Sequence, residues 1–340
     1  MRIAVVGATG AVGKELFDLL AANRLPADDI VAISSPRSVG KKVMCGDREL
    51  SVIALADGCF DGVDIAFFSA GGGTSLEWAP KAAAAGAIVV DNSSAFRMEA
   101  DVPLVVPEIN AHALDSLGER RIVANPNCTT AVFLMAAAPL HKVAGLKAVI
   151  ASSYQAVSGS GAKAIDELEQ QARAWAAGKE FPPRQVYPHD IAFNVLPHVD
   201  KFLPDGHTKE EMKLQNESRK IMEHPTLKVT CTCVRVPVFR AHSVAASLWL
   251  EKPLSPDEAR EVLRQAKGIV VQDDPAANVY PQPRERAGHH DCAVGRIRKD
   301  NVFEPGLALW VVGDQLLKGA ALNAMQIAEA LVERQLVPQR

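Results

Sequence analysis

A cysteine stands between a short polar loop and a long apolar stretch in the first half of the chain. The loop reads Asn125-Pro126-Asn127-Cys128-Thr129-Thr130, and the apolar run follows at 131–138. Pro126 favours an extended conformation at Asn125, and Asn127 is a good helix cap, so we expect Cys128 in the first turn of a helix. The N–H groups and dipole there stabilise the thiolate, the reactive form of cysteine. Cys128 is therefore the candidate nucleophile, with a small buried core residue as the alternative.

A glycine loop near the N-terminus has the spacing of a dinucleotide site. The apolar run at 2–6 is typical of a buried parallel strand, the loop Gly7-Ala8-Thr9-Gly10-Ala11-Val12-Gly13 follows, and 14–20 has helical periodicity. Glycines in this pattern permit a tight turn and let the backbone approach a pyrophosphate at the helix N-terminus. The order of strand, glycine loop and helix predicts dinucleotide binding, and a turn with a purely structural role is the alternative.

The loop after the next strand, 30–33, favours NADP over NAD. An NAD enzyme offers a carboxylate to the ribose 2′-hydroxyl at this place, whereas this chain reads Ser34-Ser35-Pro36-Arg37-Ser38. The Arg37 guanidinium can hold a phosphate with two hydrogen bonds, and Ser38 can donate a third. A solvated basic loop is the alternative.

Two further cationic positions carry weaker signals. Arg97 lies in the loop after the strand at 87–91 and is equally well explained as an anion ligand or as a surface charge. The segment from Arg235 to Ser243 includes His242, so it offers one group that binds a carboxylate and one that transfers protons near neutral pH. A single histidine among nine is more often structural than catalytic.

The remaining pattern indicates two domains. Strands at 2–6, 30–33, 63–69, 87–91 and 121–124 alternate with helices, one of them expected at 76–85, which predicts a doubly wound, Rossmann-type parallel sheet of the α/β class. Strands at 147–153, 227–236, 243–250, 292–298 and 306–313, with helices at 162–176, from 208 and at 255–267, predict an α+β second domain. Thr208 with Glu211 three residues later has the pattern of a capping box, which gives Glu211 a structural role. We place the NADP-binding domain at 1–128, completed by 315–340 with a closing helix at 322–334, and the catalytic and dimerisation domain at 129–314. The segment 178–208 has no regular period, and we expect its apolar side chains to be buried, namely those of Phe181, Tyr187, Ile191, Phe193 and Leu196.

Composition describes an ordinary globular protein of 340 residues with a net charge of −3, so neither nucleic acid nor an anionic membrane is an expected partner. No apolar stretch has the length of a signal peptide core or a membrane span. Six cysteines without a C-x-x-C pair fit reduced thiols and a cytoplasmic location. Cys231 and Cys233 lie two apart on one strand face, where core packing explains them better than a metal site, and no metal is expected.

Six motifs in chain order together resemble the aspartate-semialdehyde dehydrogenase family. They are the glycine loop 7–13, Ser35-Pro36-Arg37-Ser38, Asn127 to Thr130, Tyr154-Gln155-Ala156-Val157-Ser158-Gly159, Lys209-Glu210-Glu211-Met212-Lys213, and Arg235 to His242. The resemblance implies reduction of 4-aspartyl phosphate by NADPH to aspartate 4-semialdehyde and phosphate, through a cysteine thioester. It also implies a place in lysine, threonine, methionine and diaminopimelate biosynthesis, and a homodimer or homotetramer.

The resemblance also implies residue roles. Cys128 matches the nucleophile, His242 the acid/base, Gln155 the residue that orients the substrate, Arg235 the ligand of the substrate carboxylate, Glu210 that of its ammonium, and Lys213 with Arg97 those of phosphate. The matching cofactor residues are Gly7, Thr9, Gly10, Ala11, Val12, Gly13, Ser35, Arg37, Ser38, Ser158, Gly159 and Gln315. Two departures are Gln315, where the family commonly has Asn, and Thr129, where it often has Ser.

The alternatives differ in substrate or class. Another acyl-phosphate reductase, such as the N-acetylglutamyl-phosphate enzyme, would use similar catalysis but has no obvious use for Glu210, which suits a free ammonium. A non-catalytic dinucleotide-binding paralogue would not need Cys128, Gln155 and His242 together. A cysteine hydrolase would leave the glycine loop unexplained.

Overall fold

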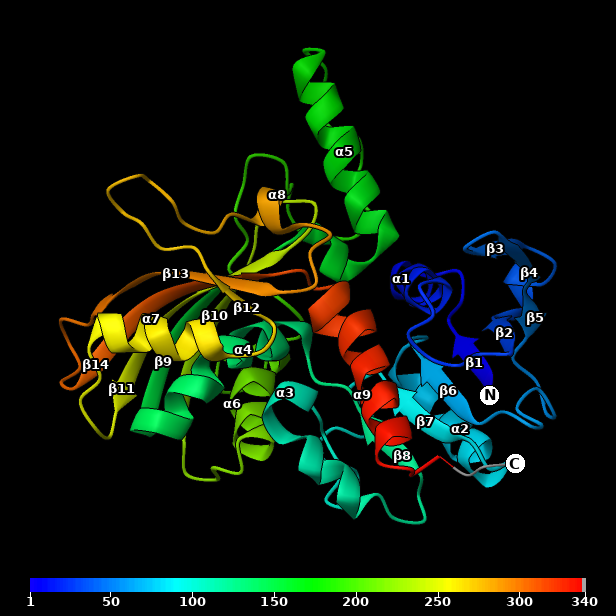
Figure 1. The fold of residues 1–340 in the computed structure, drawn as a ribbon. Helices are drawn as coiled ribbons and strands as arrows, with labels where there is room; N and C mark the ends of the chain where they lie inside the picture. Colours follow the sequence, from blue (N-terminus) through cyan, green and yellow to red (C-terminus); the bar gives the residue numbers. More distant parts are fainter. Residues whose placement is uncertain (338–340) are drawn as a thin grey trace. The chain divides into compact units, whose positions relative to one another are not determined.

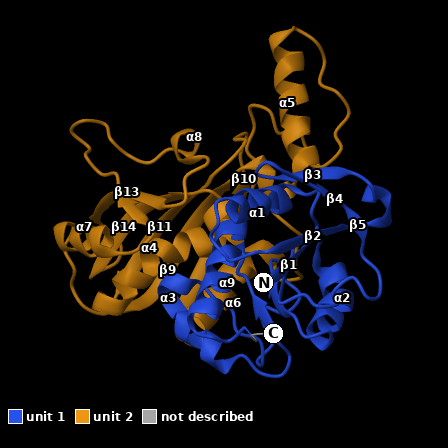
Figure 2. Ribbon diagram, turned by 45° about the vertical axis from the view of Figure 1, so that its right-hand side comes forward, with its two compact units in different colours: residues 1–127, 320–340 blue, residues 128–319 orange. Residues whose placement is uncertain are grey.

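The chain forms two compact units in a computed structural model that describes residues 1–337. The first unit comprises residues 1–127 and the segment from Ala320 onward, and the second comprises Cys128–Gly319 (Figure 2). The functional domain limits inferred from the sequence, 1–128 with 315–340 and 129–314, remain a prediction.

A parallel sheet forms the centre of the first unit, with the strand order β5-β2-β1-β6-β7-β8 among the described residues (Figure 1). The strands are β1 (Arg2–Val6), β2 (Asp29–Ser34), β5 (Ile53–Ala54), β6 (Ile65–Phe68), β7 (Ile88–Asp91) and β8 (Ile122–Ala124). Val6 pairs with Ile33 on one side and Phe68 on the other, so β1 is central. All residues of β6 and β7 are buried, as expected for strands covered on both faces.

Helices complete this unit, and the closing helix packs within it as the sequence predicted. They are α1 (Ala11–Ala21), α2 (Gly72–Ala84), α3 (Pro107–Asn110) and α9 (Leu322–Glu333), with 3₁₀ turns η1 (Pro36–Ser38) and η2 (Ala111–Ser116). The Asn323 amide on α9 donates to the Val105 carbonyl at 2.9 Å and to Asn125 Oδ1 at 2.6 Å. Arg24 and Glu329 form an ion pair at 2.6 Å. The Rossmann-type fold predicted from the alternating pattern is therefore confirmed.

Two features of the first unit differ from the expected elements. A hairpin of β3 (Lys42–Cys45) and β4 (Arg48–Ser51) was not predicted, because its strands are short and mostly exposed and give no apolar run. Helix α2 begins at Gly72 and not at residue 76, since Gly71 takes a φ of 88° and turns the chain directly into the helix.

The second unit is built on a mixed sheet with the order β10-β9-β11-β14-β13-β12. Its strands are β9 (Leu146–Gln155), β10 (Lys228–Arg235), β11 (His242–Leu250), β12 (Ile269–Val271), β13 (Cys292–Lys299) and β14 (Gly306–Gly313). Its helices are α4 (Cys128–Ala144), α5 (Ala162–Ala176), α6 (Lys209–Ile221), α7 (Pro256–Gln265) and α8 (Pro283–Arg286), with the 3₁₀ turn η3 (Val157–Ser160). The π-helical turn η4 (Leu317–Ala321) includes the last residues of this unit and the first two residues of the returning segment. β9 pairs in parallel with β10 and antiparallel with β11, which brings the ends of all three strands to one region. Helices α4, α6 and α7 pack against this sheet.

Helix α5 has the predicted limits and extends away from the sheet (Figure 1). The segment 178–208 that follows contains no helix and only isolated bridges, as expected. Ile191 and Leu196 are buried, whereas the predicted burial of Phe193 is wrong, because its side chain is 62% exposed. Its ring instead contacts that of Trp175 on α5, with centroids 4.7 Å apart. Within residues 1–337, none of the helices combines the length and apolarity that a membrane span requires.

Candidate active site

Cys128 is the first residue of α4, as its loop predicted, and its side chain is partly exposed. The C-terminal end of the second unit passes close to it at Gly319. A Cβ atom added at Gly319 would lie 2.8 Å from the Cys128 Cβ, so only glycine fits there without displacing the cysteine. The position at a helix N-terminus favours a thiolate, because N–H groups of the first turn have no intrahelical acceptor.

Gln155, the last residue of β9, is held by hydrogen bonds at both ends of its amide. Its Oε1 accepts from the Ser153 hydroxyl at 2.9 Å, and its Nε2 donates to Glu210 Oε1 at 3.1 Å. Ser153 and Gln155 share one face of the strand, and both are at most 1% exposed. The amide orientation is therefore fixed, with its nitrogen directed toward α6.

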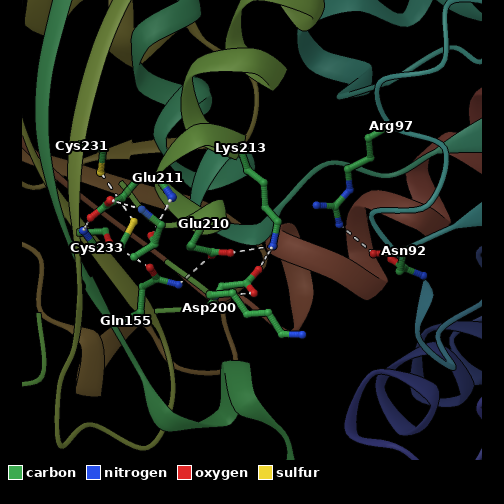
Figure 3. Close-up of polar contacts among 12 residues, drawn as sticks. Asn92, Arg97, Gln155, Asp200, Glu210, Glu211, Lys213, Cys231 and Cys233 are labelled. Atoms are coloured by element: carbon green, nitrogen blue, oxygen red, sulfur yellow. Dashed lines mark hydrogen bonds and ion pairs between the residues drawn. The ribbon is translucent and has the colours of Figure 1, made fainter. Parts of the chain in front are cut away.

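Glu210 and Lys213 lie three residues apart on α6, so they share one face of the helix, and they form an ion pair. Lys213 Nζ donates to Glu210 Oε2 at 3.0 Å and to Asp200 Oδ2 at 2.8 Å, and Figure 3 shows all three side chains converging. Burial disfavours the charge on Lys213, but the two carboxylates outweigh it and raise the lysine pKa. The site thus contains a partly exposed cation between two anions, next to the Gln155 amide.

A capping box fixes the start of α6. The Thr208 hydroxyl accepts from Glu211 N–H at 3.3 Å, and Glu211 Oε2 accepts from Thr208 N–H at 2.7 Å. The structural role that the spacing predicted for Glu211 is confirmed. Its second oxygen accepts from Cys233 N–H at 3.1 Å, so the same carboxylate ties the helix to β10.

His242 and Arg235 are both anchored to the main chain of Ala156. The Ala156 N–H donates to His242 Nδ1 at 3.0 Å, and the Ala156 carbonyl accepts from Arg235 Nη1 at 2.7 Å. A Cβ added at Gly159 would lie 3.0 Å from that Nη1 and 3.2 Å from His242 Nε2. The three predicted site residues therefore meet at one point. Burial, together with the charge of Arg235, lowers the pKa of His242 well below its ordinary value.

Gln315 and Ser158 are joined to each other in the second unit. The Gln315 Nε2 donates to the Ser158 hydroxyl, and its Oε1 accepts from Ala241 N–H at 2.8 Å. Ala241 has a φ of 72°, a strained conformation for a residue with a side chain, and it directly precedes His242. The resemblance implies that Gln315 contacts the cofactor, and in this structure its amide also supports the segment that carries His242.

Cys231 and Cys233 point to the same side of β10, as predicted, and their sulfur atoms are 3.8 Å apart. Both are buried. In the described part of the chain, no three His, Cys, Asp or Glu side chains gather in a way that would hold a metal ion.

In the first unit, Arg97 is buried and contacts main-chain carbonyls. Its Nε donates to the Asn125 carbonyl and its Nη2 to the Asn92 carbonyl, both at 2.8 Å. Figure 3 shows the guanidinium directed at Asn92. Arg97 thus holds the loop that leads to Cys128, a contact that neither residue type nor spacing indicated.

The glycine loop fits a dinucleotide pyrophosphate. Gly7 has a φ of 92°, and a Cβ there would lie 2.4 Å from the Ser69 carbonyl oxygen, while a Cβ at Gly13 would lie 2.5 Å from the Gly7 oxygen. The cap residue Gly10 has no side chain to satisfy the first-turn N–H groups of α1, and the first turn holds no acidic residue. Open N–H groups at a close-packed helix start form a cradle for phosphate.

The predicted ribose-phosphate loop forms η1, directly after β2. Ser35 and Arg37 are exposed and Ser38 is buried, so the cation faces solvent beside the carboxyl end of the sheet. Thr9 of the glycine loop lies 3.2 Å from Ser34 through their hydroxyl oxygens, which brings the two predicted cofactor segments together.

Four residues of the site were missed by sequence reasoning: Ser153, Ala156, Asp200 and Gly319. Ser153 had a usable signal, because residues two apart on a strand share a face with the marked Gln155. Asp200 lies in an irregular segment, and Ala156 acts only through its main chain, so neither residue type nor spacing identified them.

Family models match both units. Residues 2–117 match the NAD binding domain of semialdehyde dehydrogenase, and residues 137–318 match its dimerisation domain. The chain therefore has a nicotinamide dinucleotide-binding domain and a domain that serves oligomerisation in this family.

Individual relatives match over nearly the whole length. An aspartate-semialdehyde dehydrogenase from Aquifex aeolicus is 52% identical, with 99% of each chain covered, and one from Bacillus subtilis is 44% identical over 99% of each. The Vibrio cholerae aspartate semialdehyde dehydrogenase II complexed with ASA superposes with a TM-score of 0.94 at 39% identity, over 98% of both chains. The Candida albicans enzyme with NADP gives 0.76 at 25% identity over 99% of both. From the domain matches and these full-length relatives together, the chain belongs to the aspartate-semialdehyde dehydrogenase family.

Proposed function

We propose that this chain catalyses the reversible, NADPH-dependent reduction of 4-aspartyl phosphate to aspartate 4-semialdehyde and phosphate. The observation that carries the proposal is the connected group of Gln155, Glu210 and Lys213, the first two of them buried, in the same unit as the helix-start Cys128. An amide, an anion and a cation suit a substrate with an ammonium, a carboxylate and a phosphate. The product would serve lysine, threonine, methionine and diaminopimelate biosynthesis.

Cys128 is the proposed nucleophile. Its thiolate attacks the acyl carbon, a C–S bond forms as the C–O bond to phosphate breaks, and phosphate leaves with that electron pair and takes up one proton. A nicotinamide dinucleotide, when bound, supplies a hydride to the thioester carbon. Breaking of the C–S bond then returns an electron pair to sulfur and frees the aldehyde. The helix N-terminus favours both the attacking and the returning thiolate.

Substrate recognition is assigned to charged groups of known position. Arg235 would bind the substrate carboxylate, Glu210 its ammonium, and Lys213 with Arg97 the phosphate. Lys213 already pairs with Glu210 and Asp200, so substrate charges would replace contacts that these side chains make with one another. A free ammonium distinguishes this substrate from N-acetylglutamyl phosphate, because an acetamide gives the Glu210 carboxylate no cation to pair with.

NADP is the proposed form of the dinucleotide. Gly7, Gly10 and Gly13 with the N–H groups of α1 would hold the pyrophosphate, and Arg37 with Ser38 would hold the 2′-phosphate. The NADP-binding domain would comprise residues 1–128 together with 315–340. The catalytic and dimerisation domain would comprise residues 129–314. Ser158, Gly159 and Gln315 are proposed for the nicotinamide end.

A homodimer or homotetramer is proposed through the second unit. The exposed side chains Ile150 and Tyr154 on β9, with Trp310 beside Tyr154 at 5.2 Å between ring centroids, offer an apolar sheet face. We also propose a cytoplasmic location, because the described cysteines form no disulfide.

The direct test is phosphate-dependent reduction of NADP on addition of aspartate semialdehyde. Cys128→Ala should abolish turnover while leaving NADP binding unchanged, and Cys59→Ala, in a turn of the first unit, should leave both unchanged. Absence of activity in the folded parent protein, or appreciable turnover by Cys128→Ala, would contradict the proposal.

A further inference from the structure

Arg235 carries a buried positive charge that no carboxylate within residues 1–337 neutralises. The residue is 5% exposed, and its Nη1 donates to the Ala156 carbonyl at 2.7 Å. A buried charge without an ionic partner is costly, so other groups must stabilise it. The second group that contacts this guanidinium is an aromatic ring.

The ring belongs to Tyr187, in the irregular segment between α5 and α6. Its centroid lies 6.0 Å from Cζ of Arg235, at the outer limit of the cation–π range. The Tyr187 hydroxyl donates to the Val157 carbonyl at 3.4 Å and lies close to the Ser160 side chain. The tyrosine thus contacts both the guanidinium and the turn η3, which directly follows Ala156.

A neutral ring suits a residue that is to bind the substrate carboxylate. Burial raises the pKa of Tyr187, although the Arg235 charge opposes this, so the phenol carries no charge at neutral pH. A carboxylate in its place would neutralise Arg235 and repel the substrate carboxylate. The ring stabilises the cation through its quadrupole and leaves the positive charge available.

The same segment also fixes the main chain of Arg235. Leu196 N–H donates to the Arg235 carbonyl at 2.9 Å, and Arg235 N–H donates to the Leu196 carbonyl at 2.8 Å. The segment therefore holds this residue at its main chain through Leu196 and at its side chain through Tyr187.

Two buried side chains of α5 hold the segment on both sides of Tyr187. Glu167 Oε2 accepts from the main-chain N–H groups of residues 185 and 186, at 2.8 and 2.6 Å. One turn further along the helix, Gln171 Oε1 accepts from those of residues 191 and 192, both at 3.0 Å. Four main-chain donors of a segment without regular structure are thus satisfied by α5, the helix that extends away from the sheet (Figure 1).

We propose that Tyr187 is a positioning residue that holds and stabilises Arg235 for the substrate carboxylate, and that α5 serves the site by fixing the segment that carries Tyr187. The inference rests on the proposed function and deepens it, because it adds a neutral aromatic support to the recognition of the carboxylate.

Tyr187→Leu and Tyr187→Phe form a matched pair. Leucine removes the aromatic face, so the KM for aspartate semialdehyde should rise about tenfold while kcat changes less than about twofold. The KM for phosphate should stay unchanged, because phosphate is assigned to Lys213 and Arg97. Phenylalanine keeps the ring and should restore the KM for aspartate semialdehyde to within about twofold of the parent value.

A second pair tests the role of α5. Gln171→Ala removes the acceptor of two main-chain N–H groups, and the KM for aspartate semialdehyde should rise at least about threefold with the KM for phosphate unchanged. Gln170→Ala is the control, since the Gln170 amide donates to Asp166 on the same helix at 2.7 Å. This variant should match the parent in both constants. If Tyr187→Leu does not fold, the Gln171 pair still decides whether the segment serves carboxylate recognition.

The outcomes separate this inference from the proposed function. In active parent protein, a parent-like KM for aspartate semialdehyde in Tyr187→Leu, or an equal rise in the KM for phosphate, would overturn the inference alone. An equal rise in Tyr187→Phe and Tyr187→Leu would also overturn it, because the ring would then have no part in the effect. Failure of the parent protein to reduce NADP with aspartate semialdehyde and phosphate would refute the proposed function instead.

Discussion

The Gln155 amide nitrogen lies 3.1 Å from a carboxylate oxygen of Glu210, and this contact connects the end of β9 to the first turn of α6. The amide can point its nitrogen at Glu210 only because its oxygen is held by the Ser153 hydroxyl. The proposed substrate-orienting residue thus depends on a serine that touches no substrate.

Ser153→Ala should therefore impair turnover through Gln155. Loss of the hydrogen bond frees the amide to turn, and we expect kcat/KM for aspartate semialdehyde to fall about tenfold, equivalent to about 1.4 kcal/mol. Ser152→Ala is the matched control, since its side chain lies on the opposite face of the same strand. Steady-state kinetics on both variants check this, and equal kcat/KM in the two would rule out the positioning role.

Two capping boxes allow a second comparison. Thr208 caps α6, which carries Glu210 and Lys213, whereas Ser255 caps α7, which carries no proposed site residue. Thr208→Ala and Ser255→Ala should each cost about 1 kcal/mol of unfolding free energy. Only Thr208→Ala should also raise KM for aspartate semialdehyde, because its helix start frays beside Glu210. Urea unfolding and kinetics measure the two effects, and a raised KM in both variants would count against the argument.

Gly319 should be required for the geometry of the nucleophile. Gly319→Ala places a Cβ 2.8 Å from the Cys128 Cβ, closer than real Cβ atoms approach, so the cysteine must move. A displacement of this kind can lower kcat about a hundredfold. Gly118→Ala is the control, since no atom lies within 4 Å of the added carbon. Undiminished kcat in Gly319→Ala would show that the Cys128 position tolerates the shift.

Arg37 should determine the choice of dinucleotide. Removing its guanidinium in Arg37→Ala deletes charge-assisted hydrogen bonds to the 2′-phosphate, which are worth about 1.5–3 kcal/mol, and should weaken NADP binding about tenfold to a hundredfold. NAD binding should hardly change. Calorimetric titration with both dinucleotides measures this, and Lys41→Ala removes a nearby exposed cation as a control. Equal weakening of NADP and NAD would remove the basis for the assignment.

The sequence predicted what depends on pattern and on local chemistry. Buried runs such as β1, the helix start at Cys128 and the capping box of Thr208 are encoded within a few residues, so their positions follow from the residue order. Capping geometry in particular needs only two side chains three residues apart.

Contacts between distant segments were not predictable in this way. Ala156 and His242 are 86 residues apart, and their hydrogen bond uses a main-chain N–H that every non-proline residue has. Phe193 was expected inside because of its apolar ring, but a left-handed φ of 59° in an irregular segment places it against Trp175 at the surface. Such contacts are set by the tertiary fold and not by residue type.

The pair His141 and His224 predicts a loss of stability in acid. The rings stack with centroids 5.2 Å apart, and His141 Nδ1 accepts from Leu146 N–H at 3.0 Å. Burial first, and then the charge of His224, lower the pKa of His141 below 6.5, although Glu251 opposes this shift. Below about pH 6.5, His141 therefore binds a proton in the unfolded chain but stays neutral in the folded chain until the pH reaches its lowered pKa.

The stability contributed by neutral His141 is accordingly present above pH 6.5 and is lost as the pH falls toward the lowered pKa. His141→Asn keeps an acceptor for Leu146 without a titrating ring, so its unfolding free energy should fall less between neutral and mildly acidic pH. His242 has a lowered pKa and adds a loss of the same sign, but it does so equally in parent and variant. His189→Asn replaces an exposed histidine and should follow the parent. Urea unfolding across this range decides the point, since identical pH slopes in His141→Asn and the parent protein would mean that the ring is not proton-linked to folding.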